Sequence, residues 1–200
     1  EPAPEFLEAH LRAHSSGKRR GVLGAVPVAV GPDSPPVVRF IGERFERHLQ
    51  KLARPGHEIG IRDFYSGNFS LDRETFLEVG LFDEEFKIYG NEDGELAIRL
   101  RAAGVELVYS PEALARQHYE KDFAALARDK MAQGRTSVVC ALRHPETVPS
   151  LRIGTYRPGP VNWRLLRSVL PPGSRLFRCL PARIPAYFRR LEPRPSPLPP

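Results

Sequence analysis

The sequence predicts an α/β protein in which a mixed sheet is flanked by helices. Segments with the apolar spacing of amphipathic helices alternate along the chain with short, apolar, β-rich runs. Turn clusters of Gly and Pro separate these segments. Such alternation is typical of α/β architectures. A chain of 200 residues, 41% hydrophobic and 27% charged, is long enough to bury a core and has the composition of a globular protein.

The first third of the chain predicts two helices with a strand between them. The first helix covers Pro4–His14, with its proline in the first turn. The apolar run Gly21–Val30 predicts a buried strand that Pro27 interrupts or confines to an edge. After a turn, Val37–Ala53 predicts the second helix. The expected buried faces are Phe6, Leu7, Leu11 and His14 in the first helix, and Ile41, Phe45, Leu49 and Leu52 in the second.

The stretch from residue 66 to residue 104 organises the rest of the chain. Ser66–Ser70 reads as a short strand or turn. Asp72–Val79 predicts a helix that has Asp72 as its N-cap and ends at Gly80. Gly90–Gly94 is an acidic turn between two glycines. It opens a further predicted helix over Glu95–Ala103, closed by Gly104.

The segment after this stretch predicts one more strand and one long helix. Val105–Tyr109 is the strand, and Pro111 stops it. Asp122–Leu142 is the helix, with an expected buried face of Phe123, Leu126, Met131 and Val138.

Composition changes near Pro149, which divides the chain into a region over 1–148 and an extension over 149–200. Residues 150–200 hold 11 of the 21 prolines and ten arginines against one acid, Glu192, a net charge of +9. Because the whole chain carries +6, residues 1–149 carry −3. Short amphipathic helices are predicted over Val161–Leu170 and Ser174–Leu180, and a disordered or polyproline end follows. The extension is therefore basic and partly helical, and it either lies on an anionic membrane or is a solvated tail.

Several classes of protein are excluded or disfavoured by the sequence. The basic charge belongs to the extension, and the signatures of nucleic-acid-binding folds are absent, so we expect no nucleic-acid partner. Cys140 and Cys179 form neither a zinc pattern nor a disulfide framework, which favours a cytoplasmic setting, peripheral at a membrane if the extension lies on one and free of it if the extension is a solvated tail. No apolar run approaches the roughly 20 residues of a membrane-spanning helix.

The acidic turn is the strongest candidate for chemistry. It presents two adjacent carboxylates, Glu92 and Asp93, at the start of a helix, where the helix dipole favours their charged form. An ionised carboxylate on a loop beside a rigid scaffold is a candidate general base. The alternative is that both carboxylates only cap the following helix, and local chemistry does not separate the two readings.

From about Glu1 to about Gly134 the chain resembles the acceptor-side half of a family 2 glycosyltransferase with the GT-A fold. The resemblance rests on Gly67-Asn68, the segment Leu81–Glu84, and Gly90-Asn91-Glu92-Asp93 followed by Leu96, Arg99-Leu100 and Gly104. It implies a partial GT-A-like sheet. It also implies that the chain begins just after the family's Asp-x-Asp metal motif, so that the nucleotide-binding half is missing or supplied elsewhere and the chain alone binds nucleotide-sugar poorly.

The resemblance also implies a function and roles for particular residues. The reaction would be inverting transfer of a sugar from a nucleotide-sugar to a hydroxyl of a carbohydrate or lipid-linked acceptor. Asp93 matches the family's base, and Glu92 would orient the acceptor or Asp93. Gly67, Asn68 and Asn91 would contact substrate. His118 would be a ligand of a divalent metal, Mg²⁺ or Mn²⁺, whose main ligands lie outside this chain. The alternative is a non-catalytic remnant of the fold that binds a sugar or a protein.

Overall fold

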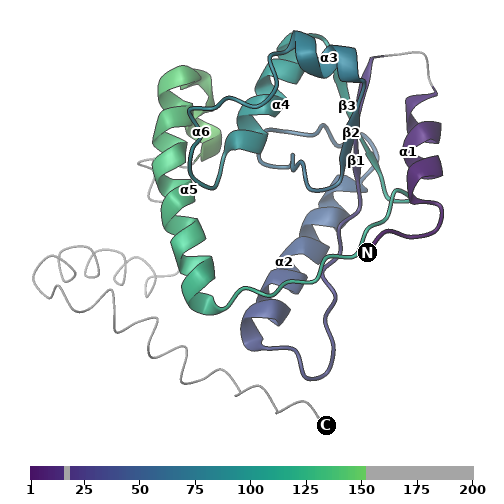
Figure 1. The fold of residues 1–200 in the computed structure, drawn as a ribbon, viewed down its shortest axis with the longest axis vertical. Helices are drawn as coiled ribbons and strands as arrows, with labels where there is room; N and C mark the ends of the chain where they lie inside the picture. The colour runs from purple at the N-terminus through teal and green to yellow at the C-terminus, as the bar shows by residue number, and fades with distance from the viewer. Residues whose placement is uncertain (16–18, 152–200) are drawn as a thin grey trace, which may run out of the picture.

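The computed structural model describes residues 1–15 and 19–151 (Figure 1). The helices predicted over 161–170 and 174–180, and most of the basic extension, lie outside these residues. Ten elements follow one another: α1 Phe6–His14, β1 Arg20–Gly24, α2 Pro36–Leu52, β2 Phe69–Leu71, α3 Arg73–Glu78, α4 Glu92–Ala102, β3 Glu106–Ser110, α5 Phe123–Arg143, the 3-10 helix η1 Pro145–Thr147, and α6 Val148–Leu151.

The three strands form a mixed sheet in the order β2-β1-β3. β1 runs antiparallel to β2, with Val22 opposite Ser70, and parallel to β3, with Val22 opposite Val108. The central strand is buried because it has neighbours on both edges and helices on both faces. The predicted mixed α/β class is confirmed, and the arrangement is compatible with part of a GT-A-like fold.

The main core lies on the face of the sheet that α2 and α4 cover. Its centre is formed by Leu23 of β1, Leu49 and Leu52 of α2, and Leu96 and Leu100 of α4. In Figure 1, α1 stands on one side of the sheet, whereas α2, α4 and α5 stand on the other. Since α4 packs directly on the sheet, the start of this helix is held in a fixed position.

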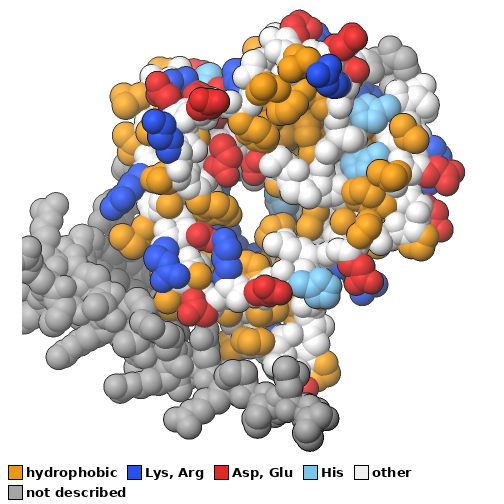
Figure 2. Space-filling view, viewed as in Figure 1, with side chains coloured by type: hydrophobic (Ala, Val, Ile, Leu, Met, Phe, Trp, Pro, Cys, Tyr) orange, Lys and Arg blue, Asp and Glu red, His pale blue; other side chains and the backbone are white. Residues whose placement is uncertain are grey.

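The predicted buried face of α1 is partly wrong, since only Phe6 and His14 of its four residues are half-buried. Leu7 and Leu11 are 73% and 71% exposed, and the buried residues are Ala9 and His10. The helix turns this side inward because His10 forms hydrogen bonds with buried polar groups on β2 and just before it. Hydrophobic and His side chains consequently lie together at the surface in the region of α1 (Figure 2).

The strand predicted over residues 21–30 is too long. β1 ends at Gly24, and beyond it only an isolated bridge joins Val28 to Gln117. Two features explain the early end. Pro27 has no N–H to donate, and the Ala25 carbonyl accepts from the Asn68 side chain as well as from the Ala115 N–H.

The predicted buried face of α5 is also partly wrong. Met131 is 65% exposed and Val138 is also exposed, whereas Phe123 and Leu126 are half-buried. The buried residues of this helix are Ala124, Thr136 and Cys140. Small and polar residues face inward because the start of α4 approaches α5 closely there, as described below.

The predicted N-cap of α3 is confirmed. Asp72 caps α3, with its carboxylate accepting from the Thr75 N–H at 2.8 Å. Within residues 1–15 and 19–151, none of the helices combines the length and the apolar character that a bilayer-spanning segment needs.

Candidate active site

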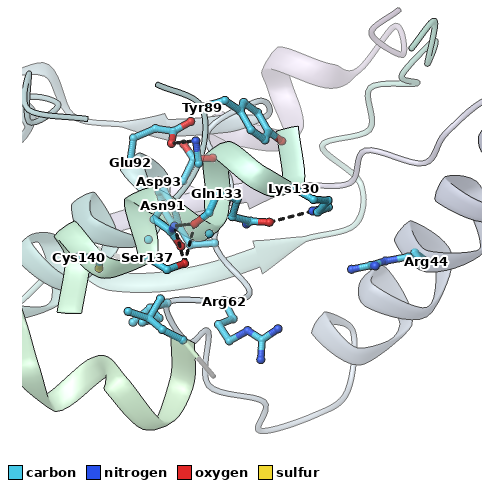
Figure 3. Close-up of a pocket in the computed structure, with 16 residues that line it drawn as sticks. Arg44, Arg62, Tyr89, Asn91, Glu92, Asp93, Lys130, Gln133, Ser137 and Cys140 are labelled. Atoms are coloured by element: carbon cyan, nitrogen blue, oxygen red, sulfur yellow. Dashed lines mark hydrogen bonds between the residues drawn. The ribbon is translucent and has the colours of Figure 1, made fainter. Parts of the chain in front are cut away.

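A cavity of about 390 Å³ lies between the first turn of α4 and the side of α5 (Figure 3). Its volume is in the range of small-molecule sites. Five segments form its walls. They are Arg44 of α2, the loop residues Ile61, Arg62 and Phe64, the turn Tyr89–Gly94, the α5 residues Lys130, Gln133, Gly134, Ser137 and Cys140, and Leu151.

The predicted acidic turn is the first turn of α4 itself. The helix begins at Glu92, three residues earlier than predicted, and Asn91 precedes it in the left-handed conformation with φ 67°. The Gly90 N–H donates to the Glu92 carboxylate at 2.6 Å, which closes the turn. One oxygen of Glu92 is therefore engaged by a backbone N–H that precedes the helix, and this contact does not cap α4.

Asn91 ties this turn to α5. Its side-chain nitrogen lies 2.9 Å from the carbonyl oxygen of Gln133 and also contacts the hydroxyls of Thr136 and Ser137, at 2.8 and 3.0 Å. A carbonyl oxygen can only accept, so this contact fixes which end of the amide faces α5. Asn91, predicted to bind substrate, lines the cavity, but its amide nitrogen is engaged in contacts with α5.

The two glycines of the turn make room for the protein's own backbone. A Cβ at Gly90, whose φ is 112°, would lie 2.8 Å from Cα of Gln133. A Cβ at Gly94 would lie 3.0 Å from the carbonyl oxygen of Ile61. The first turn of α4 is therefore wedged between α5 and the Ile61 loop. These two glycines therefore accommodate the protein's own backbone.

Asp93 is the carboxylate that remains available. It is the second residue of α4, it is half-buried, and it lines the cavity. Among residues 1–15 and 19–151, no side-chain hydrogen bond or ion pair engages its carboxylate. An ionised, unengaged carboxylate facing a cavity can accept a proton from a bound hydroxyl.

Tyr89 stands beside the acids at the mouth of the cavity. Partial burial raises the pKa of its hydroxyl above the ordinary value; Lys121 opposes the rise, and the negative charges of Asp129, Glu92 and Asp93 add to it. The Lys121 ammonium lies 4.9 Å from the centre of the Tyr89 ring, a cation–π contact. Tyr89 therefore stays a neutral hydroxyl that can donate a hydrogen bond.

Cations occupy another part of the wall. Arg44, Arg62 and Lys130 come from α2, a loop and α5, and Figure 3 shows them apart from the cluster formed by Glu92, Asp93 and Asn91. Lys130 donates to the side-chain oxygen of Gln133 at 2.9 Å. Partial desolvation lowers the pKa of Lys130, the positive charge of Arg44 lowers it further, and the negative charge of Asp129 opposes the shift.

Two buried acids that the sequence analysis did not single out hold the site in place. Glu95, only 2% exposed, accepts two hydrogen bonds from Nε and one from Nη2 of Arg99, at 2.7–3.0 Å. His144 Nε2 is 3.3 Å from the same carboxylate. The i,i+4 spacing of Glu95 and Arg99 is the sequence signal that could have indicated this ion pair. Arg99 also donates to the carbonyls of Val79 and Leu81, which ties α4 to the preceding loop. The contact between His144 and Glu95 ties the same helix to the end of α5.

Asp63 similarly fixes the position of the loop that contains Ile61. Its buried carboxylate lies 2.6 Å from Lys51 Nζ and 2.9 Å from His57 Nε2, and it accepts from the Gly60 N–H at 3.2 Å. Burial alone would raise its pKa, but the hydrogen bonds from Lys51, Gly60 and His57 outweigh burial, so the pKa lies below the ordinary value. The loop whose Ile61 packs against Gly94 is thereby fixed to α2.

Gly67 and Asn68 are not brought to this cavity. They line a separate, shallower depression of about 940 Å³ on the α1 side of the sheet. Asn68 is 3% exposed, and its nitrogen donates to the carbonyls of Ala25 and Ala113 at 3.1 and 2.8 Å. Its oxygen lies 2.8 Å from His10 Nε2. Both ends of the Asn68 amide therefore serve the fold, and the predicted substrate contact has no support from its surroundings.

His118 also lies outside the cavity. Its exposed ring has Nε2 3.6 Å from a carboxylate oxygen of Glu1. In the part of the chain that the structure describes, no three His, Cys, Asp or Glu side chains come together as a metal site. The described donor set at His118 therefore does not by itself fit a divalent cation.

Comparison with known families agrees with the site in outline. Residues 46–122, less than half of the chain, match the model of a family described as the N-terminal domain of galactosyltransferase. The matched span runs from α2 through α4 and β3 to the loop that carries His118, and so includes the acidic turn. It supports a glycosyltransferase-type domain, with a nucleotide-sugar donor and an acceptor in general terms. Assignment to family 2 stays a prediction.

Proposed function

We propose that this protein transfers a sugar from a nucleotide-sugar to an acceptor hydroxyl by single displacement, with Asp93 as the general base. The observation that carries the proposal is the Asp93 carboxylate, which faces a ligand-sized cavity and is left unengaged by the described chain. The galactosyltransferase match over the same segment supports the reaction class.

The role of each residue follows from the proton-accepting or hydrogen-bonding capacity that its contacts within the protein leave free. The Asp93 oxygen takes the acceptor proton as the acceptor oxygen forms its bond to the anomeric carbon. The bond from that carbon to the nucleoside diphosphate breaks, and its electron pair leaves with the diphosphate, so the configuration inverts. Glu92 closes the turn through the Gly90 N–H and so positions Asp93. Tyr89 can donate a hydrogen bond to the bound acceptor.

Two substitutions test the proposal in the complete native enzyme, with UDP-galactose as donor and release of UDP and of galactosylated product as the measurement. Asp93→Asn keeps the size of the side chain but removes the basic oxygen. We expect a loss of about 10²–10⁴-fold in turnover. Glu92→Gln should cost less, because an amide oxygen still accepts from the Gly90 N–H. Glu84→Gln, at an exposed acid outside the cavity, is the control and should leave turnover unchanged.

The pattern of losses separates the interpretations. If Glu92→Gln abolishes transfer while Asp93→Asn does not, the two roles are exchanged. If both variants transfer like the Glu84→Gln control, the acidic turn is only a helix start. Absence of transfer by the unaltered chain together with retained sugar binding would favour the non-catalytic binding domain.

A further inference from the structure

A second group of reactive side chains lies on the α1 side of the sheet, away from the cavity that Asp93 faces. The hydroxyl oxygen of Ser70, on β2, is 2.7 Å from Nδ1 of His10 and 2.8 Å from Nε2 of His14, which are one turn apart on α1. Nε2 of His10 is in turn 2.8 Å from the side-chain oxygen of Asn68. A hydroxyl, an imidazole and an amide oxygen are thus joined in the order of nucleophile, base and orienting group that is typical of acyl-transfer enzymes.

The contacts of Asn68 determine which atoms donate in this group. The side-chain nitrogen of Asn68 donates to two buried main-chain carbonyls, so the oxygen end of the amide faces His10. This oxygen can only accept, and the hydrogen of the neutral His10 ring therefore lies on Nε2, which leaves Nδ1 as an acceptor. The hydroxyl of Ser70 donates to this Nδ1. Because the hydroxyl has one hydrogen, Nε2 of His14 must donate to Ser70 Oγ.

This pattern prepares the Ser70 oxygen for nucleophilic attack. Nδ1 of His10 can take up the hydroxyl proton, while the Asn68 oxygen keeps its contact with Nε2 and holds the ring in place. The His10 residue is only 6% exposed, so its ring is held by protein groups rather than by solvent. The N–H of His14 favours negative charge on Oγ. A hydroxyl oxygen has two lone pairs, and the contact with His14 uses one, so the other is available to an electrophile.

The surroundings of Ser70 indicate the class of substrate. Ser70, His10 and His14 line a depression of about 940 Å³, which is large enough for a small molecule. Its walls also contain apolar side chains: Phe6, Leu7, Leu11, Phe69 and Leu71. Hydrophobic and His side chains share the surface in this region (Figure 2). The arginines of the depression form ion pairs with acids: Arg19 with Glu78 and Arg20 with Glu106. An uncharged substrate with an apolar chain therefore fits these walls.

We propose that Ser70 is the nucleophile of a second active site, with His10 as its base, that cleaves carboxylic esters with an apolar acyl chain. Ser70 Oγ forms a bond to the carbonyl carbon while its proton passes to Nδ1 of His10. The bond from that carbon to the alcohol oxygen breaks, and the alcohol leaves with the proton from His10. Water then attacks the acyl carbon and gives a proton to His10. The bond to Oγ breaks, Oγ takes this proton back, and the carboxylic acid is released. None of these steps involves sugar transfer.

The test treats the full chain with octyl fluorophosphonate, a probe that reacts with nucleophilic serines and carries an apolar chain. Oγ forms a bond to phosphorus and fluoride leaves. The adduct is stable, so mass spectrometry of peptides identifies the modified residue. We expect the adduct on Ser70 and, in the labelled chain, loss of the hydrolysis of p-nitrophenyl octanoate. His10→Gln removes the base and should slow labelling about 10²-fold or more. Ser15→Ala, at an exposed serine just after α1, is the control and should change neither rate.

Leu7→Gln and Leu11→Gln test the apolar walls. Both side chains are exposed, so the substitutions should preserve the fold, slow labelling by the octyl probe several-fold, and leave labelling by ethyl fluorophosphonate unchanged. An adduct on a residue other than Ser70, no adduct, or hydrolysis that continues after Ser70 is labelled would overturn the inference. The labelled residue is identified in the unaltered chain, so the test holds even if His10→Gln does not fold.

Discussion

The side-chain nitrogen of Asn91 donates to the main-chain carbonyl of Gln133 at 2.9 Å, across 42 positions of sequence. Through this contact the residue that starts α4 is fixed to the middle of α5. The carboxylate of Asp93, two residues later, therefore has a defined position relative to the cavity wall. Loops placed in this way by a rigid scaffold are common carriers of catalytic groups.

The contact between Gly90 and Gln133 leads to a prediction about stability. Gly90→Ala places a Cβ 2.8 Å from Cα of Gln133, at a φ of 112° that side chains disfavour, so α4 and α5 must separate. We expect a loss of roughly 1–3 kcal/mol in the free energy of unfolding, measured by denaturant titration. Gly67→Ala is the control, since a Cβ there has nothing within 4 Å and needs no unusual φ. Equal stability of the two variants would mean that the turn does not pack as described.

Asn68 should be needed for stability rather than for binding. Asn68→Ala leaves the carbonyl of Ala113 and Nε2 of His10 without their buried partner, whereas the carbonyl of Ala25 keeps the Ala115 N–H. Each unsatisfied buried group costs about 1–3 kcal/mol, so we expect a loss of several kcal/mol and a clearly lower melting temperature. Gln50→Ala, at an exposed position on α2, should change stability little. A normal melting temperature with weakened UDP-galactose binding would instead support the substrate contact predicted from the sequence.

A chain of hydrogen bonds on the α1 side predicts acid sensitivity. Ser70 Oγ lies 2.7 Å from His10 Nδ1 and 2.8 Å from His14 Nε2. Burial lowers the pKa of His14 below its ordinary value of 6.5, the nearby His10 and Arg20 lower it further, and Asp72 opposes them. The unfolded chain therefore takes up protons at a higher pH than the folded one, and stability falls as the pH drops below about 6.5.

Melting temperatures recorded between about pH 8 and pH 5 test this expectation. His14→Gln keeps a donor for Ser70 but does not titrate, so its melting temperature should fall less on acidification than that of the unaltered chain. His118→Gln, at an exposed ring far along the sequence, is the matched control and should retain the original slope. The same slope in His14→Gln as in the control would exclude His14 as the source of the acid sensitivity.

Local patterns predicted the helices and strands well wherever neighbouring residues decide the conformation. The Asp72 cap needs only the backbone N–H of Thr75, three residues away, and it is present as predicted. The apolar spacing of α2 likewise predicted that Ile41, Leu49 and Leu52 are buried, and Leu49 and Leu52 belong to one core cluster with apolar residues of α4 and β1.

The same patterns failed where a polar contact from a distant segment outweighed apolar spacing. Leu7 and Leu11 are exposed on α1 because Asn68 and Ser70 bind His10 on the opposite side of the helix. Met131 is exposed on α5 because the glycine-containing turn before α4 takes the inner side, near Gln133 and Thr136. In both cases the partner lies more than 40 positions away, so no local window contains it.

The sequence by itself determined the α/β class and the acidic turn at a helix start, and its resemblance to a glycosyltransferase family singled out Asp93 as the candidate base. The class and the turn depend on residue type and short spacing, which local chemistry fixes. Only the tertiary structure decided that Asn91, Glu92 and Asp93 share a cavity, while Asn68 and His118 lie elsewhere. It also brought Arg44 and Lys130 to the wall of that cavity. The physical reason is that a cavity is formed by segments far apart in the chain, and their packing on a common core sets which side chains meet.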